Sequence, residues 1–81
     1  MNMYLVKRQD LCSYDEYDSF VVIAENETEA RNTHPSPYRE SWNGKAKMYD
    51  SWVNADDVIV EKIGYSDETK TRVVCASFNS G

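Results

Sequence analysis

The chain has 81 residues, enough for one domain with a single small core and too few for a deep pocket beside it. Hydrophobic residues make up 41% of the chain and charged residues 28%, as in a folded globular domain rather than a disordered one. The net charge of −5 argues against nucleic-acid binding through phosphate contacts. No apolar run approaches the roughly 20 residues that cross a bilayer, and the N-terminus lacks a signal-peptide core, so we expect a cytoplasmic protein with no membrane partner.

The first half of the chain predicts two strands. Residues 3–8, MYLVKR, begin apolar and end charged, which is typical of a short strand with one end in water. Residues 17–25 predict a second strand with apolar side chains on both faces: Phe20, Val22 and Ala24 on one, and Val21 and Ile23 on the other. Because both faces are apolar, we place this strand in the interior of the sheet.

A helix is predicted to begin directly after the second strand. Asn26 is a favourable N-cap, and Glu29 follows it at the spacing of a capping box. We expect Ala30 to contact the sheet and Arg31 to be solvated. The helix should end near His34, because Pro35 cannot continue it.

Residues 35–56 form a variable connection that contains several aromatic residues and has no clear periodicity. A long connection in a small domain is often functional or hides a short element. Residues 57–63 and 71–78 then predict two more strands around a polar hairpin loop. The expected fold is a single α+β domain, ββαββ, with a four-stranded, mainly antiparallel sheet and one helix on one face. The other face would be covered only by the aromatic connection or by a partner.

At this point the sequence resembles a family. The segments YDSFVVIAENETEAR and HPS, a Trp-containing middle, DVIVEKIG and a closing ASFNSG resemble small uncharacterised accessory proteins encoded by phages and prophages. The resemblance covers most of the chain and implies a phage accessory gene product. It brings no activity or catalytic residue with it. Such proteins often act by binding, and inhibitors of host defence are one class of them.

Two groups of residues are candidates for a binding surface. Tyrosine gives a large contact area at a small entropic cost, and acids can pair with arginines on a partner. The acidic tyrosine segment has both: Tyr14, Asp15, Glu16, Tyr17 and Asp18. Its structural alternative is a solvated turn with Tyr17 packed on the sheet edge.

The second group could stack a base and bind a phosphate, because it combines aromatic rings with basic residues. Its members are Trp42, Tyr49, Trp52, Arg39, Lys45 and Lys47. The structural alternative is that both tryptophans belong to the core.

Other chemistry is weakly indicated. His34 could act as a general base or phosphate ligand, held in an exposed geometry by Pro35, but we favour a polar residue that ends the helix and lies at the negative end of its dipole. Cys12 and Cys75 have no zinc spacing, and we expect a loop thiol and a small buried residue respectively. Asp56 and Asp57 are more typical of a turn and helix cap than of a metal pair, so we expect neither a metal nor a cofactor.

The leading hypothesis is a non-enzymatic phage protein that binds and inhibits a host protein, such as a defence effector of the kind that anti-CRISPR proteins block. It would bind through the acidic tyrosine segment and one exposed sheet face. The alternative is an oligomeric sponge that sequesters a nucleotide signal, and an enzyme that uses His34 is the third possibility. A homodimer fits the first two hypotheses, because a thin two-layer domain can pair its open face or an edge strand with a copy of itself.

Overall fold

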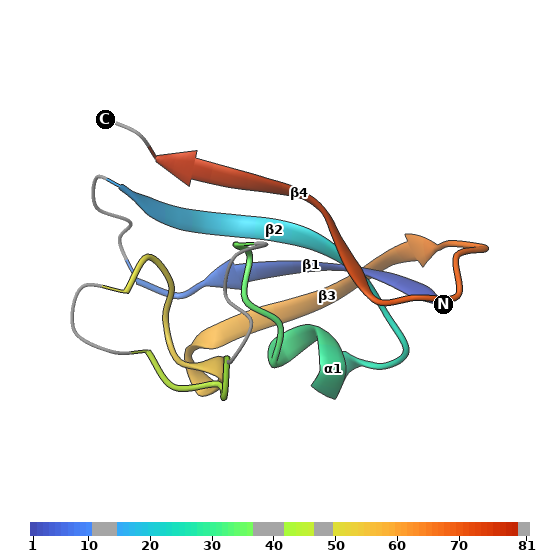
Figure 1. The fold of residues 1–81 in the computed structure, drawn as a ribbon, viewed down its shortest axis with the longest axis horizontal. Coiled ribbons are helices and arrows are strands. Elements are labelled where there is room, and N and C mark those ends of the chain that lie inside the picture. The colour runs from blue at the N-terminus through green and yellow to red at the C-terminus, as the bar shows by residue number, and fades with distance from the viewer. Residues whose placement is uncertain (11–14, 37–41, 47–49, 80–81) are drawn as a thin grey trace.

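The computed structural model describes residues 1–10, 15–36, 42–46 and 50–79. Its elements in chain order are β1 (Asn2–Arg8), β2 (Glu16–Ala24), α1 (Glu27–Arg31), a 3-10 helix η1 (Ala55–Asp57), β3 (Val58–Tyr65) and β4 (Arg72–Asn79). The four strands form one sheet in the order β3-β1-β2-β4, and every neighbouring pair is antiparallel (Figure 1). The predicted α+β fold is therefore confirmed, and β2 lies in the interior of the sheet as expected.

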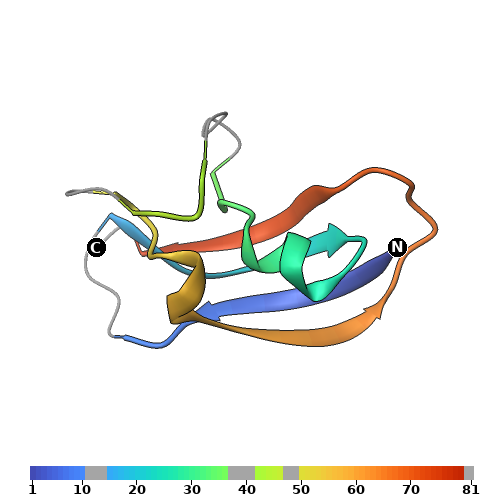
Figure 2. The ribbon, with the colours of Figure 1, turned by 90° about the horizontal axis from the view of Figure 1, so that it is seen from below.

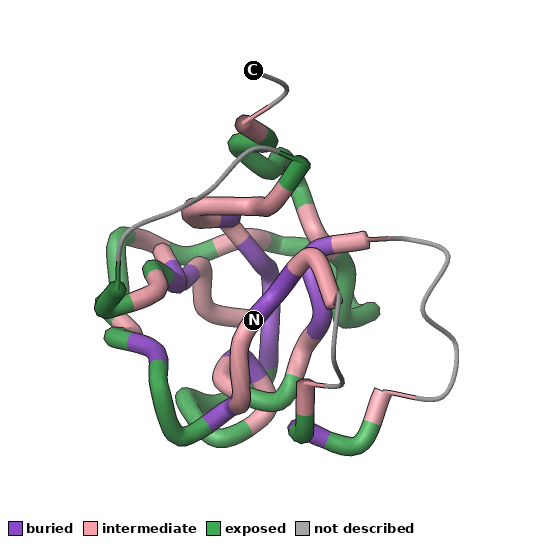
Figure 3. The backbone as a smooth tube through the Cα atoms, turned by 90° about the vertical axis from the view of Figure 1, so that its left-hand side faces the viewer, coloured by how far each residue is buried: buried purple, intermediate pink, exposed green. Residues whose placement is uncertain are grey.

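The core lies between the sheet and the segments that follow β2. Figure 2 shows α1 and the connection after it on the same side of the sheet. Buried stretches of backbone run through the middle of the molecule (Figure 3). The core cluster consists of Tyr4, Val6, Phe20, Val22, Ala24, Ala30, Trp52 and Val58. Because Trp52 belongs to this cluster, the described part of the aromatic connection covers the same face as the helix and leaves the opposite face to a partner or to solvent.

The start of α1 follows its sequence signal. The Asn26 side chain accepts a hydrogen bond from the Glu29 backbone N–H at 2.9 Å, as an N-cap should. The Glu29 carboxylate reaches back to the N–H of Glu25 at 3.3 Å, one residue before the position that a capping box uses. Ala30 is buried against the sheet as predicted.

The end of α1 differs from the prediction, because the helix ends at Arg31 rather than near His34. The side chains after it bond to the last helical carbonyls and so replace a further turn. The Asn32 amide donates to the Thr28 carbonyl at 2.8 Å, and the Thr33 hydroxyl donates to the Glu29 carbonyl at 2.7 Å. Local side-chain bonds of this kind compete with helix continuation.

Arg31 is not simply solvated, which corrects a second expectation. Its guanidinium donates to the carbonyls of Ala55 at 3.1 Å and Val58 at 3.0 Å, and it also contacts the Glu27 carboxylate at 3.3 Å. These bonds join the end of α1 to η1 and to the start of β3. Arg31 thus stabilises the packing of α1 against η1, the two short helices on this side of the sheet.

Cys75 is exposed, so the expectation that it would be a small buried residue is wrong. It lies in β4, which is an edge strand of the sheet. Its pairing with Val21 places it on the face of the sheet opposite α1, which α1 does not cover.

Candidate functional site

The face of the sheet opposite α1, called the uncovered face below, carries several exposed and partly exposed side chains among the described residues. Tyr4 and Val6 of β1 point into the core on the opposite face. Strand side chains alternate, so Met3, Leu5 and Lys7 point to the uncovered face. Cross-strand pairing then places the neighbours of these three residues on the same face.

The uncovered face is built as three rows that cross the four strands. The middle row is Glu61, Leu5, Val21 and Cys75. The row towards the start of β3 is Ile59, Lys7, Ser19 and Ser77. The row at the opposite end is Gly64, Met3, Ile23 and Arg72, and Ile23 in this row is buried, at 2% exposed. Ile63 lies at the irregularity in the β1–β3 pairing and, by alternation with Glu61, belongs to this face as well.

This face carries apolar side chains on β1, β2 and β3, with the charged residues Lys7 on β1, Glu61 on β3 and Arg72 on β4 among them. Ile59 is 50% exposed and Ile63 is 49% exposed, while Leu5 and Val21 are partly exposed. Lys7 lies directly opposite Ile59 in the neighbouring strand and contributes a positive charge. Contiguous exposed apolar side chains on a small domain mark interaction surfaces more often than isolated ones do.

The acidic tyrosine segment occupies one end of the sheet, and most of its groups are engaged within the chain. Tyr14 lies outside the described residues. The Tyr17 ring packs edge-to-face on Phe78, with centroids 4.9 Å apart, and its backbone N–H donates to the Ser51 carbonyl at 2.9 Å. Asp18 accepts hydrogen bonds from Ser19 at 2.8 Å and from Ser77 at 3.1 Å.

The rest of this segment is held by Arg8. The Arg8 guanidinium, 6% exposed, lies 3.7 Å from the Glu16 carboxylate and donates to the Tyr17 carbonyl at 3.1 Å. It also binds Asp10 through two hydrogen bonds of 2.6 and 2.9 Å, and this hydrogen bonding lowers the pKa of the Asp10 carboxyl. Asp15 is exposed and has a positive φ of 60°. Of the described acids in this segment, Asp15 is the most available to a partner.

The second predicted group is not gathered into a ligand site by the described residues. Trp52 is 2% exposed, and its indole packs edge-to-face on Phe20 with centroids 5.2 Å apart, so it offers no open face to a base. Trp42 is partly buried against the core. Lys45 is exposed, with its ammonium 4.0 Å from the Asp56 carboxylate. Arg39, Lys47 and Tyr49 lie outside the described residues.

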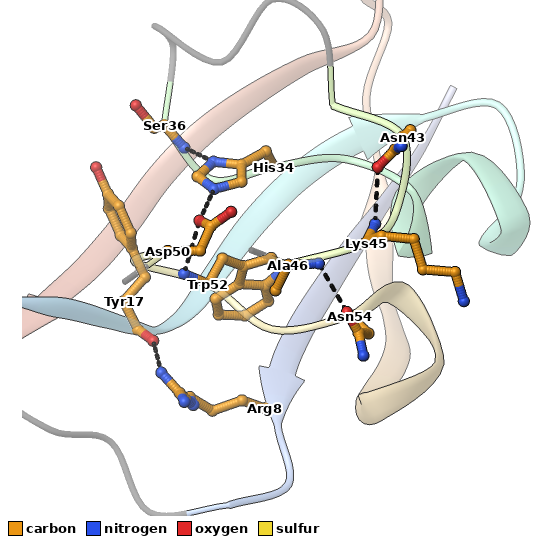
Figure 4. A network of polar contacts seen from close by, with 10 residues as sticks. All are labelled: Arg8, Tyr17, His34, Ser36, Asn43, Lys45, Ala46, Asp50, Trp52 and Asn54. Atoms are coloured by element: carbon orange, nitrogen blue, oxygen red, sulfur yellow. Dashed lines mark hydrogen bonds and ion pairs between the residues drawn. The ribbon is translucent and has the colours of Figure 1, made fainter. Parts of the chain in front are cut away.

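His34 is buried rather than exposed, and it forms a pair with Asp50 (Figure 4). The His34 Nε2 atom lies 3.1 Å from the Asp50 carboxylate, and both side chains are 1% exposed. The His34 Nδ1 atom accepts a hydrogen bond from the Ser36 backbone N–H at 2.9 Å. An accepting ring nitrogen carries no proton, so the proton sits on Nε2 and is donated to Asp50. The arrangement describes a neutral imidazole with a fixed tautomer.

The His34–Asp50 pair holds the connection in place. Asp50 also accepts from the Trp52 backbone N–H at 3.3 Å, so one carboxylate joins the segment after α1 to the residue that fills the core. The ring of Trp42 packs on His34 with centroids 5.0 Å apart. Both ring nitrogens of His34 are engaged and shielded from solvent, and neither is placed to take a proton from a substrate. No sequence signal links two residues that are sixteen positions apart, which is why the pairing was missed.

Comparison with known families finds no family model that matches this chain, and neither the curated proteins nor the solved structures give a match. No helix within the described residues is long and apolar enough to cross a membrane. Within those same ranges, no three His, Cys, Asp or Glu side chains are grouped as metal ligands would be.

Proposed function

We propose that this protein is a non-enzymatic binder that acts on another protein through the uncovered face of its sheet. The observation that carries the proposal is the pair of apolar side chains Ile59 and Ile63 on the edge strand β3, each about half exposed on that face. Burying these side chains against a partner removes apolar surface from water at about 25 cal/mol per Å². In the single chain these side chains remain in contact with water, so their burial by a partner would favour binding.

The charged side chains of the face supply the polar part of such an interface. Lys7, Glu61 and Arg72 lie in the three rows among the apolar side chains, one in each row. Apolar side chains together with polar and charged ones are the usual anatomy of a protein–protein interface. Charges of both signs favour a protein partner over a nucleic acid, which would require a one-signed basic surface.

The resemblance to phage accessory proteins extends the proposal to the identity of the partner. The partner would be a host protein in the cytoplasm, and a defence effector is the class that this resemblance favours. Binding would inhibit the partner by covering a surface that it needs. The acidic end of the sheet, where Asp15 is exposed, adds negative charge beside the face and would guide a basic partner towards it.

The proposal of binding rather than catalysis is supported by the state of the single histidine. Catalysis by His34 would need a ring nitrogen within reach of a substrate. Both nitrogens are bonded inside the protein, to Asp50 and to the Ser36 N–H. The buried pair therefore fits a structural role.

The proposal is tested by introducing positively charged side chains on the uncovered face at positions that do not belong to the core. We expect the double variant Ile59→Lys and Ile63→Lys to lose a host protein that the unaltered chain retains in affinity purification, with an affinity loss of more than about tenfold in titration of the purified pair. Buried lysines would be left without partners in the complex. A partner retained with unchanged affinity would rule out this face as the binding surface.

A matched control separates the loss of the face from the loss of fold. Thr28→Lys together with Glu25→Gln makes nearly the same change in charge at exposed positions beside and on α1, on the covered side of the sheet. This control should bind its partner as the unaltered chain does. Far-ultraviolet circular dichroism and urea unfolding of both variants should show the native fold.

A further inference from the structure

The outer edge of β4 is an unpaired strand edge in the described structure. The sheet order leaves β4 with β2 as its single strand neighbour, and Figure 1 shows β4 at the margin of the sheet. The extended contacts of β4 with other elements are likewise confined to β2. Half of the backbone N–H and C=O groups of a strand point away from its one neighbour, so this edge presents hydrogen-bonding groups to the outside.

The two edge strands of the sheet, β3 and β4, differ in the number of charged residues that they carry. Exposed edges are usually protected by charged side chains, proline or bulges. The β3 edge carries the adjacent charges Glu61 and Lys62, both exposed, and an irregular pairing with β1. In β4 the single charge is Arg72 at its start, and residues 73–79, VVCASFN, have none although most are exposed. Exposed positions would accept lysine or glutamate without cost to the core, and the sequence places none there.

The exposed apolar residues of β4 are arranged symmetrically. Val74 is 39% exposed and Phe78 is 45% exposed, and they lie two residues on either side of Ala76. The Asn79 carbonyl accepts from the Asp15 N–H at 2.6 Å, so the backbone of Asn79 faces β2. By alternation the backbone groups of Ala76 and Phe78 face outwards, where a further strand would meet them.

We propose that two copies of this chain pair through their β4 strands, antiparallel, about a two-fold axis at Ala76. This register sets Val74 of one copy opposite Phe78 of the other, and it does so twice. Aromatic and β-branched residues directly opposite one another are a favourable cross-strand pair. A second copy fits this edge because the edge is complementary to itself, as a two-fold interface requires.

Charge is compatible with the same register even though each chain has a net charge of −5. The two Arg72 side chains lie at opposite ends of the paired strands, far from each other. Each is bonded to Glu68 of its own chain through contacts of 2.9 Å, so neither needs a partner in the second copy. The β2–β4 ladder is irregular between the Val21–Cys75 and Val22–Val73 pairs, and the proposed ladder between copies ends there, at Val74.

The dimer would be one continuous eight-stranded sheet. A two-fold axis perpendicular to the sheet leaves the uncovered faces of both copies on the same side. Two partner molecules, or one partner with a repeated surface, could then bind side by side with a gain in avidity. The pairing itself does not depend on the proposed binding function and can be tested without any partner.

The first experiment measures mass by sedimentation or light scattering from micromolar to millimolar concentration. We expect the unaltered chain to approach twice the 9.4 kDa of one chain. Val74→Lys should give a monomer because a lysine on an exposed strand edge opposes pairing with a further strand. Adding Phe78→Glu should restore the dimer, because each lysine would then face a glutamate. A chain that stays monomeric at every concentration would overturn the proposal.

The second experiment tests the register. In a background with Cys12→Ser and Cys75→Ser, Ala76→Cys places two thiols opposite each other at the axis, within reach of a disulfide. We expect it to form a covalent dimer under mild oxidation, whereas Lys62→Cys on the β3 edge in the same background should not. A dimer that survives Val74→Lys but is lost with Ile59→Lys would show pairing through the uncovered face instead and would contradict the β4 interface.

Discussion

The two faces of the sheet carry similar apolar side chains but are completed in different ways. On the covered face, Phe20 and Val22 are met by Trp52, and the chain that brings Trp52 there is secured by Asp50. On the uncovered face, Leu5 and Val21 have neighbours within the sheet and no covering layer among the described residues. The difference separates the residues that make the fold from those left available for binding.

The two faces also differ in how their polar and charged side chains are accommodated. Buried polar groups must be bonded, and the covered face meets that need with the His34–Asp50 pair and with Arg31. On the uncovered face the described charged residues, Lys7, Glu61 and Arg72, are all exposed to water. A change on the covered face should therefore alter stability, and a change on the uncovered face should alter binding.

The largest effect is expected at Trp52. Trp52→Ala removes a side chain that is 2% exposed and leaves a cavity against Phe20. We expect the free energy of unfolding to fall by about 3–5 kcal/mol, measured by urea denaturation. Since a domain of this size has a total of about 5–10 kcal/mol, a partly unfolded variant agrees with the account. A loss below about 1 kcal/mol would show that the covering layer contributes little to the core.

Asp50→Ala should have the next largest effect. It leaves the His34 Nε2–H and the Trp52 N–H without their acceptor in a buried position. We expect a loss of about 2–3 kcal/mol in the free energy of unfolding. His34→Ala and the double variant complete a thermodynamic cycle, and their coupling should exceed about 0.5 kcal/mol. Additive losses would mean that the two side chains do not stabilise each other.

A smaller effect is expected at Asp10, at the rim of the sheet, and it should depend on pH. The hydrogen bond from Arg8 lowers the pKa of Asp10 below its usual value of 3.8. A carboxyl with a lowered folded-state pKa adds stability above its unfolded pKa, and this is lost as pH falls through the folded pKa. The stability difference between the unaltered chain and Asp10→Asn should thus be constant near neutral pH and shrink below about pH 4. A difference that grows in acid would contradict the assignment.

The smallest effect on stability is expected on the uncovered face. Ile59→Lys replaces a side chain that is 50% exposed, so the free energy of unfolding should change by no more than about 0.5 kcal/mol. The same urea titration checks this value beside that of Trp52→Ala. A loss of several kcal/mol would show that Ile59 is part of the fold and would remove the contrast between the faces.

Local patterns predicted most of the fold. The alternation of residues 17–25 and the Asn26 cap depend on neighbours in sequence, and both are found as expected. The misjudged residues depend on distant contacts. Arg31 bonds to carbonyls 24 and 27 positions away, and His34 meets Asp50 across sixteen positions. Nothing in the local sequence distinguishes these side chains from solvated ones.

The candidate site was predicted in part. The sequence predicted that the aromatic connection or a partner would cover the face opposite the helix, whereas Trp52 of that connection packs on the helix side and Leu5 and Ile59 lie on the opposite face. The composition of the acidic tyrosine segment predicted a binding surface, yet within the chain Arg8 donates to the Tyr17 carbonyl and the Tyr17 ring packs on Phe78. Composition shows which side chains are capable of binding. Only the sheet register shows which of them share a surface.

The most direct test is carbene footprinting of the purified protein alone and in complex with its captured partner, read by mass spectrometry at single residues. Labelling of Met3, Ile59 and Ile63 on the uncovered face should fall on binding, while labelling of Thr28 on α1 should stay unchanged. The opposite result, with Thr28 protected and the uncovered face labelled as before, would contradict the claim that this face is the binding surface.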